Sequence, residues 1–190
     1  MEIIAEGLGV YLKSPSAVDA EQVARRANDY DIAYNIAGWG SFPNPYTVSD
    51  ALSFIEKAAK EQIEGIGIHA AVRLKSGNDI IGMVGLKAID RKDRKAEIGY
   101  WIGKEFWKKG YGTAAASIMT AYGFEVLGLN KIYARTFDFN KTSVRVLEKL
   151  GFEREGLLKE ETLHKNGFVD EVLFGLLGKN YKHGLKIIVR

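Results

Sequence analysis

Apolar and polar residues recur along this chain in patterns that predict a mixture of short strands and amphipathic helices. Strand-like runs occur at 10–12, 69–74, 80–86, 96–103, 131–137, 152–163 and 168–176. Helical spacing occurs at about 18–28, 51–62, 113–126 and 142–150. Turn sequences at 76–79 and 165–167 predict two hairpins. Strands and helices mixed in this order predict an α+β fold with a mostly antiparallel central sheet.

Two of these elements have a face that the spacing assigns to the core. The helix at 113–126 repeats apolar residues at i, i+3 and i+4, and we expect this face to pack on the sheet. Its members are Ala115, Met119, Tyr122 and Val126. Alternation in the strand at 96–103 places Ile98, Tyr100 and Ile102 on a core face, and Glu97, Gly99 and Trp101 on the opposite face.

The segment 30–46 is rich in aromatic residues, glycine and proline, and we expect an ordered loop with a short helical turn. One interpretation is a hydrophobic plug over the core. The other is the wall of a substrate site, because a linker needs fewer aromatic rings. The candidate substrate residues in this segment are Tyr34, Trp39 and Tyr46.

Length and composition narrow the class of protein. With 190 residues, we expect a single domain over 1–190 with a sizeable core. The chain contains no cysteine, which excludes disulfides, thiolate catalysis and cysteine-ligated zinc. A net charge of +3 is too small to indicate nucleic-acid binding. No apolar run approaches a membrane span and the first residues do not read as a signal peptide, so we expect a cytoplasmic protein that binds no membrane.

A basic, glycine-containing turn links the strand at 96–103 to the following helix. It consists of Lys108, Lys109, Gly110, Tyr111, Gly112 and Thr113. Backbone N–H groups at a helix start, together with the helix dipole, can hold a phosphate. The two glycines permit close approach and positive φ, and the two lysines add charge. The Lys-Ser/Thr ending of a P-loop is absent, so this is another kind of phosphate-binding turn, or an ordinary helix start.

A second motif begins at Asn140 and ends in Leu150-Gly151-Phe152. Together with the glycine turn, it resembles the GNAT superfamily of acetyl-CoA-dependent N-acetyltransferases, over roughly residues 80–155. Within that superfamily the chain looks most like the branch that acetylates ribosomal-protein N-termini. One departure is Trp107, which stands where the family usually has Gln or Arg.

The resemblance implies a fold and a cofactor. The strands 96–103 and 131–137 would be a parallel pair, splayed apart to receive acetyl-CoA. The backbone near Tyr100, Trp101 and Ile102 would bind the pantetheine arm, and Asn140 would hydrogen-bond it. The helix start at Asn140 also suits an ordinary N-cap, and both roles are compatible.

Acetyl transfer to an amine needs a proton acceptor, an oxyanion donor and a route for the leaving thiolate. Glu97 is the candidate base, because it lies beside Gly99, where an acetyl group has room. The alternative is a surface glutamate paired with Lys95 or Arg94. A backbone N–H near residues 100–102 is the candidate oxyanion donor.

The leaving-group acid differs from the common family pattern. Many members carry a tyrosine seven residues after the helix asparagine, but here that position is Leu147, which the helical spacing assigns to the core. Ser143 is the candidate substitute, and its alternative is an ordinary serine in the first turn. A thiol pKa near 8.5 means that a weak acid suffices.

The three histidines, His69, His164 and His183, show no ligand-like spacing and no evident acid partner. We therefore expect them to be non-catalytic, and we expect no metal. The favoured acceptor is the N-terminal α-amine of a protein or peptide. The alternatives are a small amine, such as a polyamine, amino acid or antibiotic, and a non-catalytic CoA-binding module. The sequence fits either a monomer or a homodimer.

Overall fold

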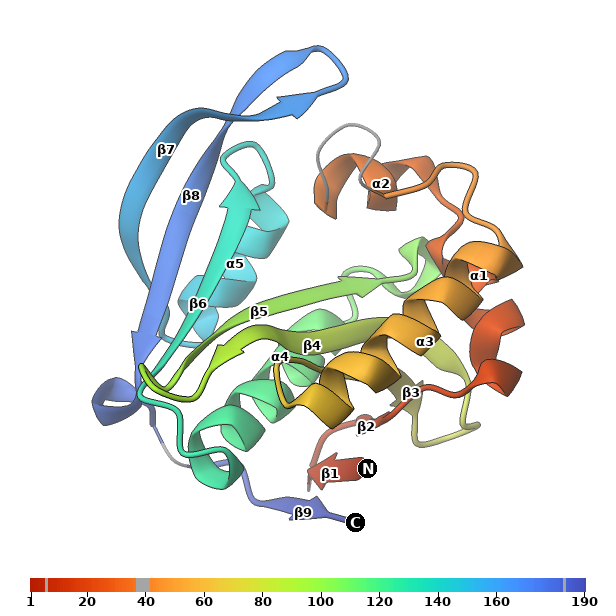
Figure 1. Ribbon diagram of the computed structural model, residues 1–190, viewed down its shortest axis with the longest axis horizontal. Helices are drawn as coiled ribbons and strands as arrows, with labels where there is room; N and C mark the ends of the chain where they lie inside the picture. The colour runs from red at the N-terminus through yellow and green to blue at the C-terminus, as the bar shows by residue number, and fades with distance from the viewer. Residues whose placement is uncertain (6, 37–41, 183) are drawn as a thin grey trace.

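The computed structural model describes residues 1–5, 7–36, 42–182 and 184–190, and its centre is a nine-stranded sheet (Figure 1). The strand order is β7-β8-β6-β5-β4-β3-β2-β1-β9. The strands are β1 Glu2–Ala5, β2 Val10–Lys13, β3 Ile68–Leu74, β4 Ile80–Asp90, β5 Lys95–Ile102, β6 Lys131–Phe137, β7 Glu153–His164, β8 Gly167–Leu177 and β9 Ile187–Val189. The α-helices are α1 Ala20–Ala27, α2 Tyr30–Ile36, α3 Val48–Glu64, α4 Tyr111–Ala121 and α5 Lys141–Lys149. Short helical segments are η1 Ala17–Asp19, η2 Lys104–Phe106, η3 Tyr122–Val126 and η4 Gly178–Asn180.

The sheet is mixed and mostly antiparallel, which confirms the predicted fold class. β5 and β6 are its parallel pair, joined only at 95–97 with 131–133. Beyond this point β5 follows β4 as far as Ile102, while β6 follows β8 as far as Phe137. The two strands therefore diverge, as Figure 1 shows, and leave an open edge on each.

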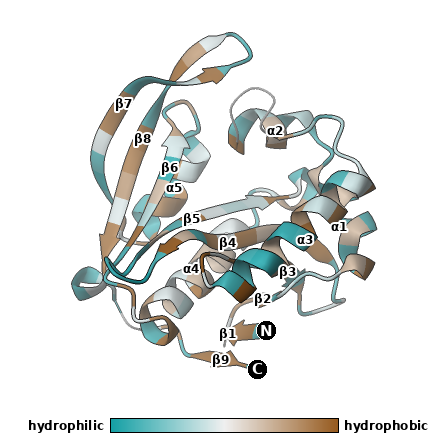
Figure 2. Ribbon diagram, in the orientation of Figure 1, coloured by the Kyte–Doolittle hydropathy of each residue, from teal (hydrophilic) through white to brown (hydrophobic). Residues whose placement is uncertain are grey.

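Helices cover both faces of the sheet. On one face, α1 and α3 pack over β3 and β4 around a smaller core that includes Val23, Ala51 and Met83. On the other face, α4 packs across β5, β4 and β2 in a larger core that includes Ile118, Met119 and Ile132. Figure 2 shows apolar residues gathered on the sheet between these layers, and polar residues on the outer turns of α3.

Some elements differ from the predicted ones. Strands β1 and β9 were not predicted; each has only three or four residues, too few for a recognisable period. The segment after residue 30 forms a true helix, α2, where a loop with one helical turn was expected. Val126 is wrong as a core residue, because it is 50% exposed. The helix changes to π geometry at η3, and the wider turn rotates Val126 away from the sheet.

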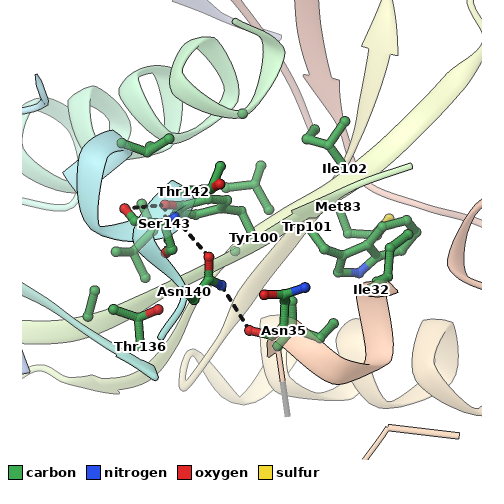
Figure 3. Close-up of a pocket in the computed structure, with 18 of the residues that line it drawn as sticks. Ile32, Asn35, Met83, Tyr100, Trp101, Ile102, Thr136, Asn140, Thr142 and Ser143 are labelled. Carbon is green, nitrogen blue, oxygen red and sulfur yellow. Dashed lines mark hydrogen bonds between the residues drawn. The ribbon is translucent and has the colours of Figure 1, made fainter. Parts of the chain in front are cut away.

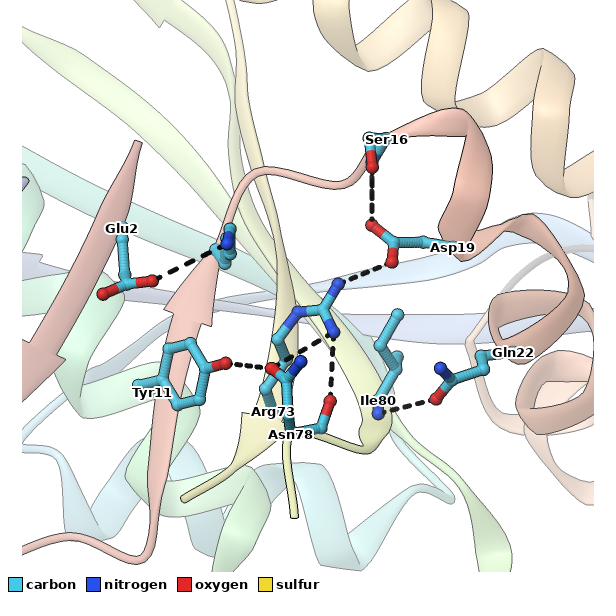
Figure 4. A network of polar contacts seen from close by, with 9 residues as sticks. Glu2, Tyr11, Ser16, Asp19, Gln22, Arg73, Asn78 and Ile80 are labelled. Atoms are coloured by element: carbon cyan, nitrogen blue, oxygen red, sulfur yellow. Dashed lines mark hydrogen bonds and ion pairs between the residues drawn. The ribbon is translucent and has the colours of Figure 1, made fainter. Parts of the chain in front are cut away.

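A buried ion pair joins the start of α1 to the sheet (Figure 4). Arg73 on β3 contacts the Asp19 carboxylate at 2.6 Å, and both side chains are less than a tenth exposed. Arg73 also donates to the backbone carbonyl of Asn78 at 3.0 Å, and Asn78 bonds to Tyr11 of β2. Burial alone would raise the pKa of Asp19, but hydrogen bonds from the Ser16 backbone and from Arg73 hold it below its usual value. The pair ties β2, β3 and η1 together.

Candidate functional site

A pocket of about 1200 Å³ occupies the space between the diverging strands (Figure 3). β5 forms its floor, α5 and the start of α4 form one side, and α2 and α3 form the other. Most of the predicted site residues line it: Glu97, Tyr100, Trp101, Ile102, Lys108, Gly110, Tyr111, Gly112, Thr113, Asn140, Ser143 and Tyr46. Two predicted residues, Lys109 and Tyr34, lie elsewhere, and Trp39 falls outside the described residues.

The turn before α4 presents backbone N–H groups to the pocket. Gly110 is the N-cap of α4 and has φ of 80°, and Lys108 is also left-handed, with φ of 62°. Gly112, which was expected to share this conformation, lies within the first helical turn instead. The first N–H groups of a helix have no acceptor within the helix, so they are available to an anion.

Two side chains explain how this turn is held. Trp107 donates from its indole Nε1 to the carbonyl oxygen of Ile102 at 2.6 Å, which pins the turn to the end of β5. Lys109 places its ammonium over the Phe106 ring, 5.5 Å from the ring centroid, and is not among the residues that line the pocket. Lys108 is therefore the lysine of this turn that faces the pocket.

A pair of hydroxyl groups spans the two halves of the pocket. The Ser143 Oγ on α5 lies 3.1 Å from the Tyr100 hydroxyl on β5 (Figure 3). Burial raises the pKa of Tyr100 to about 12, and the hydrogen bond with Ser143 opposes this only in part. Tyr100 therefore remains protonated at neutral pH, and its hydroxyl can hydrogen-bond to that of Ser143. Leu147 is 1% exposed, which confirms that it is a core residue.

Asn140 is the N-cap of α5, as one of its two interpretations predicted. Its Oδ1 accepts from the backbone N–H of Ser143 at 3.0 Å, and its Nδ2 donates to the carbonyl oxygen of Asn35 on α2, also at 3.0 Å. An amide nitrogen carries two hydrogens, so one donor remains for a ligand. Asn140 thus links α2 to α5 across the pocket.

The edge of β5 that faces away from β4 is open along the pocket. Residues 98–102 pair with β4 on one side, but β6 has already diverged from them on the other. Alternate N–H and C=O groups therefore face the pocket and can pair with an extended ligand, as an added strand would.

Glu97 lies near the point where β5 and β6 separate. Its carboxylate contacts the ammonium of Lys87 at 3.0 Å, across the β4–β5 pair, and its side chain is 13% exposed. The alternative prediction, a pair with Lys95 or Arg94, named the wrong partner, because Lys95 pairs with Asp93 instead. Strand register explains the observed pair, because Lys87 on β4 and Glu97 on β5 are directly opposite each other.

The wall opposite the glycine turn is aromatic. Phe42 stacks on Tyr46 with ring centroids 4.8 Å apart, and meets Trp101 edge-on at 6.5 Å. Tyr46 is 8% exposed, and burial followed by the charge of Asp50 raises its pKa to about 12. Tyr34 packs against His164 at 4.5 Å, outside this wall.

The sequence showed no evident acid partner for the three histidines, but the structure gives one to His69, while His183 lies outside the described residues. The Nε2 of His69 lies 2.7 Å from the Glu61 carboxylate, and His69 lines the pocket. Glu61 is on α3 and His69 is on β3, so a loop and a change of secondary structure separate them. His164 bonds instead to the backbone carbonyl of Tyr34 at 2.9 Å.

Sequence reasoning missed two polar groups of the pocket for different reasons. Alternation assigned the side chain of Tyr100 to the core, and it does pack there, but its hydroxyl reaches Ser143 at the pocket edge. An aromatic residue with a polar tip, among aliphatic core positions, is the signal that could have found it. His69 offered no such signal, because Glu61 meets it only after α3 packs on β3.

The charges along the pocket are mostly positive. The lining cations are Lys57, Lys87, Lys108, Arg135, Arg145 and Lys149, and the lining carboxylates are Asp50, Glu97 and Glu171. Each carboxylate is already engaged: Asp50 by the Thr47 cap, Glu97 by Lys87 and Glu171 by Arg135. Within the described chain, no ion pair occupies Lys108, Arg145 or Lys149, so these cations can meet an anionic ligand.

The structure gives no indication of a metal site or a membrane span in the residues that it describes. No group of three or more His, Cys, Asp or Glu side chains there is placed to hold a metal ion. None of the described helices is both long and apolar enough to cross a bilayer.

Comparison with known proteins gives a match for this arrangement. The model of the acetyltransferase (GNAT) domain family matches residues 10–153. YdaF of Bacillus subtilis, whose name describes it provisionally as a ribosomal N-acetyltransferase, is 39% identical over 107 residues, 56% of this chain and 58% of YdaF. Spermidine N(1)-acetyltransferase of Escherichia coli is 39% identical over 80 residues, 42% of this chain and 43% of that enzyme.

The fold also matches solved structures. RimJ of Mycobacterium smegmatis, determined in complex with CoA-disulfide, superposes with a TM-score of 0.86. That match has 22% sequence identity and covers 94% of this chain and 88% of RimJ. At this identity the likeness concerns the fold.

Proposed function

This chain belongs to the acetyltransferase (GNAT) domain family, and we propose that it moves an acetyl group from acetyl-CoA to the N-terminal α-amine of a protein or peptide. The observation that carries the proposal is the pocket itself. It joins an anion-binding turn, an open strand edge and a hydroxyl pair in one continuous space. These are the parts that a phosphorylated thioester donor needs.

We place acetyl-CoA by its chemistry. Its pyrophosphate meets the backbone N–H groups at the start of α4, and Lys108 adds a cation there. Arg145 and Lys149, one helical turn apart on α5, supply further positive charge along the same pocket. The pantetheine amides pair with the open edge of β5, beside Tyr100, Trp101 and Ile102.

The reaction then proceeds by direct attack. The lone pair of the neutral amine forms the new C–N bond at the thioester carbon, and the carbonyl oxygen becomes an oxyanion that a β5 backbone N–H stabilises. When the C–S bond breaks, the electron pair leaves with sulfur. Ser143 donates its proton to that sulfur and regains one through Tyr100. The nitrogen, which is positively charged after the attack, must then lose a proton. The acceptor that the sequence suggests for it is Glu97, which is paired with Lys87.

The acceptor follows from charge and basicity. At pH 7 roughly a tenth of an α-amine is neutral, against well under a thousandth of a lysine side chain. A polyamine needs carboxylates that are free to pair with it, whereas two of the three carboxylates lining this pocket, Glu97 and Glu171, already pair with cations of the protein. An α-amine needs none, and the aromatic wall around Phe42 and Tyr46 suits the first residues of a peptide.

We expect peptides beginning with Ala or Ser and containing an internal lysine to be acetylated at the N-terminus. The measurement is thiol release from acetyl-CoA, followed by mass spectrometry to locate the acetyl group. An acetyl group on the lysine would refute the proposed α-amine acceptor, but the protein would still be an acetyltransferase. No thiol release with any amine would support the remaining alternative, a non-catalytic CoA-binding module.

A small amine is the second candidate acceptor, because the spermidine enzyme of Escherichia coli is among the relatives. Spermidine in the same thiol-release assay decides between them. A kcat/KM for spermidine above that for every peptide would replace the proposed acceptor with a polyamine.

Ser143→Ala is expected to slow transfer roughly 10-fold while leaving acetyl-CoA affinity unchanged, because the thiol is a moderately good leaving group and a weak acid helps it only in part. Tyr100→Phe should have a similar effect, since it removes the partner hydroxyl. Steady-state kinetics and calorimetric titration with acetyl-CoA measure the two quantities. Ser117→Ala on α4, whose hydroxyl bonds only the Ala114 carbonyl, is the control. Equal losses of rate and affinity would make Ser143 a binding residue.

A further inference from the structure

His69 and Glu61 form an acid–imidazole pair in the wall of the pocket, on the face of the sheet that α3 covers. The His69 Nε2 and Glu61 Oε2 atoms are 2.7 Å apart, and the side chains are 16% and 20% exposed. On the basis of the proposed acetyl transfer, we propose that His69 accepts the proton that the acceptor amine loses, and that Glu61 orients it. His69 is then a catalytic residue and Glu61 a positioning residue.

The hydrogen bond to Glu61 determines which nitrogen is free. A carboxylate only accepts hydrogen bonds, so Nε2 of the neutral imidazole must carry the hydrogen. The lone pair is then on Nδ1. The ring is also held by Phe54, which meets it edge-on with centroids 5.4 Å apart. A base oriented by a carboxylate behind it is a recurrent arrangement in enzymes that activate a nucleophile.

Strand register and the position of the ring place Nδ1 of His69 over the neighbouring strand, on the side of β5. His69, Gly85 and Gly99 are directly opposite one another on β3, β4 and β5. A Cβ added at Gly85 would lie 2.7 Å from the His69 Nδ1, so the imidazole lies over Gly85 in space that any other residue would fill. The ring thereby crosses one strand spacing, about 4.8 Å, in the direction of β5.

The next position in this row is open. A Cβ added at Gly99 would meet no described atom within 4 Å, and Gly99 lines the pocket. Gly99 lies just beyond the point where β5 and β6 separate, next to the backbone that would bind the end of the pantetheine arm. An acetyl thioester there, with its attacking amine, would face the free nitrogen of His69.

The other charged groups around this position are already paired. Lys87 and Glu97 bond to each other at 3.0 Å in the neighbouring row of the sheet. Lys57 lies 3.7 Å from the second oxygen of Glu61, on the more exposed side. The Lys87 ammonium holds the Glu97 carboxylate, whereas Nδ1 of His69 has a lone pair directed over Gly85. This contrast favours His69 over Glu97 as the proton acceptor.

An ammonium that becomes an amide loses two protons while the C–N bond forms and the C–S bond breaks. One proton moves to Nδ1 of His69, where Glu61 stabilises the imidazolium, and then passes to water. The other replaces the proton that Ser143 gives to the CoA sulfur.

His69→Gln tests the proposal, because glutamine can still donate to Glu61 but has no basic nitrogen. We expect kcat/KM at pH 7 to fall roughly 100-fold or more, with acetyl-CoA affinity unchanged. The rate of the variant should rise steadily with pH as more amine becomes neutral, and added imidazole should restore part of it. Glu61→Gln should also lower kcat, because the amide removes the charge that stabilises the imidazolium and can hold the ring in the other tautomer. Glu56→Gln, at an exposed position of α3, is the matched control.

Two kinetic outcomes would overturn the proposal. One is a His69→Gln variant with wild-type kcat/KM at pH 7. The other is a loss of rate that accompanies a loss of acetyl-CoA affinity and that neither high pH nor imidazole relieves, because a merely structural residue would behave in that way. If added imidazole restored the rate of Glu97→Gln but did not change the rate of His69→Gln, the base would be Glu97.

A second measurement does not depend on the acceptor. Diethylpyrocarbonate acylates a free imidazole nitrogen, and peptide mapping by mass spectrometry locates the product. We expect His69 to react and acetyl-CoA to slow that reaction several-fold. If the wild-type protein acetylates no amine, the proposed function fails, yet this measurement still decides the position of His69. An unreactive His69, or one that acetyl-CoA does not protect, would overturn the inference.

Discussion

Gly99→Leu is expected to reduce acetyl transfer by roughly 100-fold or more while the protein stays folded, because misplacing reacting groups by about 1 Å already costs that much. The strand position tolerates a side chain, since a Cβ at Gly99 would meet no described atom within 4 Å. The larger side chain would extend into the pocket where the proposed thioester and amine must meet. Kinetics, acetyl-CoA titration and thermal unfolding together measure the effect.

Gly156→Leu is the matched control for this prediction. Gly156 also lies in a strand, has open space at its Cβ position and is away from the pocket lining. Its substitution should leave kcat/KM unchanged. Wild-type kinetics in Gly99→Leu would show that the acetyl group lies elsewhere, and a large fall in its unfolding temperature would show that the position is structural.

Arg73→Met is expected to lower the free energy of unfolding by about 3–5 kcal/mol, because it leaves the buried Asp19 carboxylate without its cation. For a chain of this size that corresponds to a fall of roughly 6–20 °C in the unfolding temperature. Urea denaturation and thermal scans measure it. Lys13→Met breaks an exposed pair with Glu2, at 3.9 Å, and should change stability by less than about 1 kcal/mol.

The stability that the pair between Asp19 and Arg73 contributes depends on pH in a definite direction. The pKa of Asp19 is lowered in the folded state from its ordinary value of 3.8. The ionised carboxylate therefore contributes stability that is fully present above this value and is lost as pH falls through the folded pKa. The difference between wild type and Arg73→Met should be constant near pH 7 and should narrow in acid, because Asp19 becomes protonated first in the variant, which lacks the arginine, and only at lower pH in the wild type. A difference that widened in acid would contradict the role given to this pair.

Local pattern predicted most of the elements because each depends on near neighbours in the chain. The strand predicted at 131–137 is β6 with the same bounds, and the helix predicted at 142–150 differs from α5 by one residue at each end. The glycine turn was also local, since a left-handed N-cap at Gly110 needs a residue without a side chain. The pattern did not predict β9, which is held by its register with β1.

The candidate site likewise has features that depend on near neighbours in the chain and features that depend on tertiary contacts. The sequence by itself determined the family, through the turn at 108–113 and the helix that starts at Asn140, and it placed Glu97, Gly99 and Trp101 together on one face by alternation alone. Only the tertiary structure decided the partners: Ser143 with Tyr100, Glu97 with Lys87, and His69 with Glu61. Periodicity reports whether a side chain is buried, but strand register and the packing of helices on the sheet set what it meets there. Whether a histidine can act as a base depends on those contacts, and they arise when α3 packs against β3.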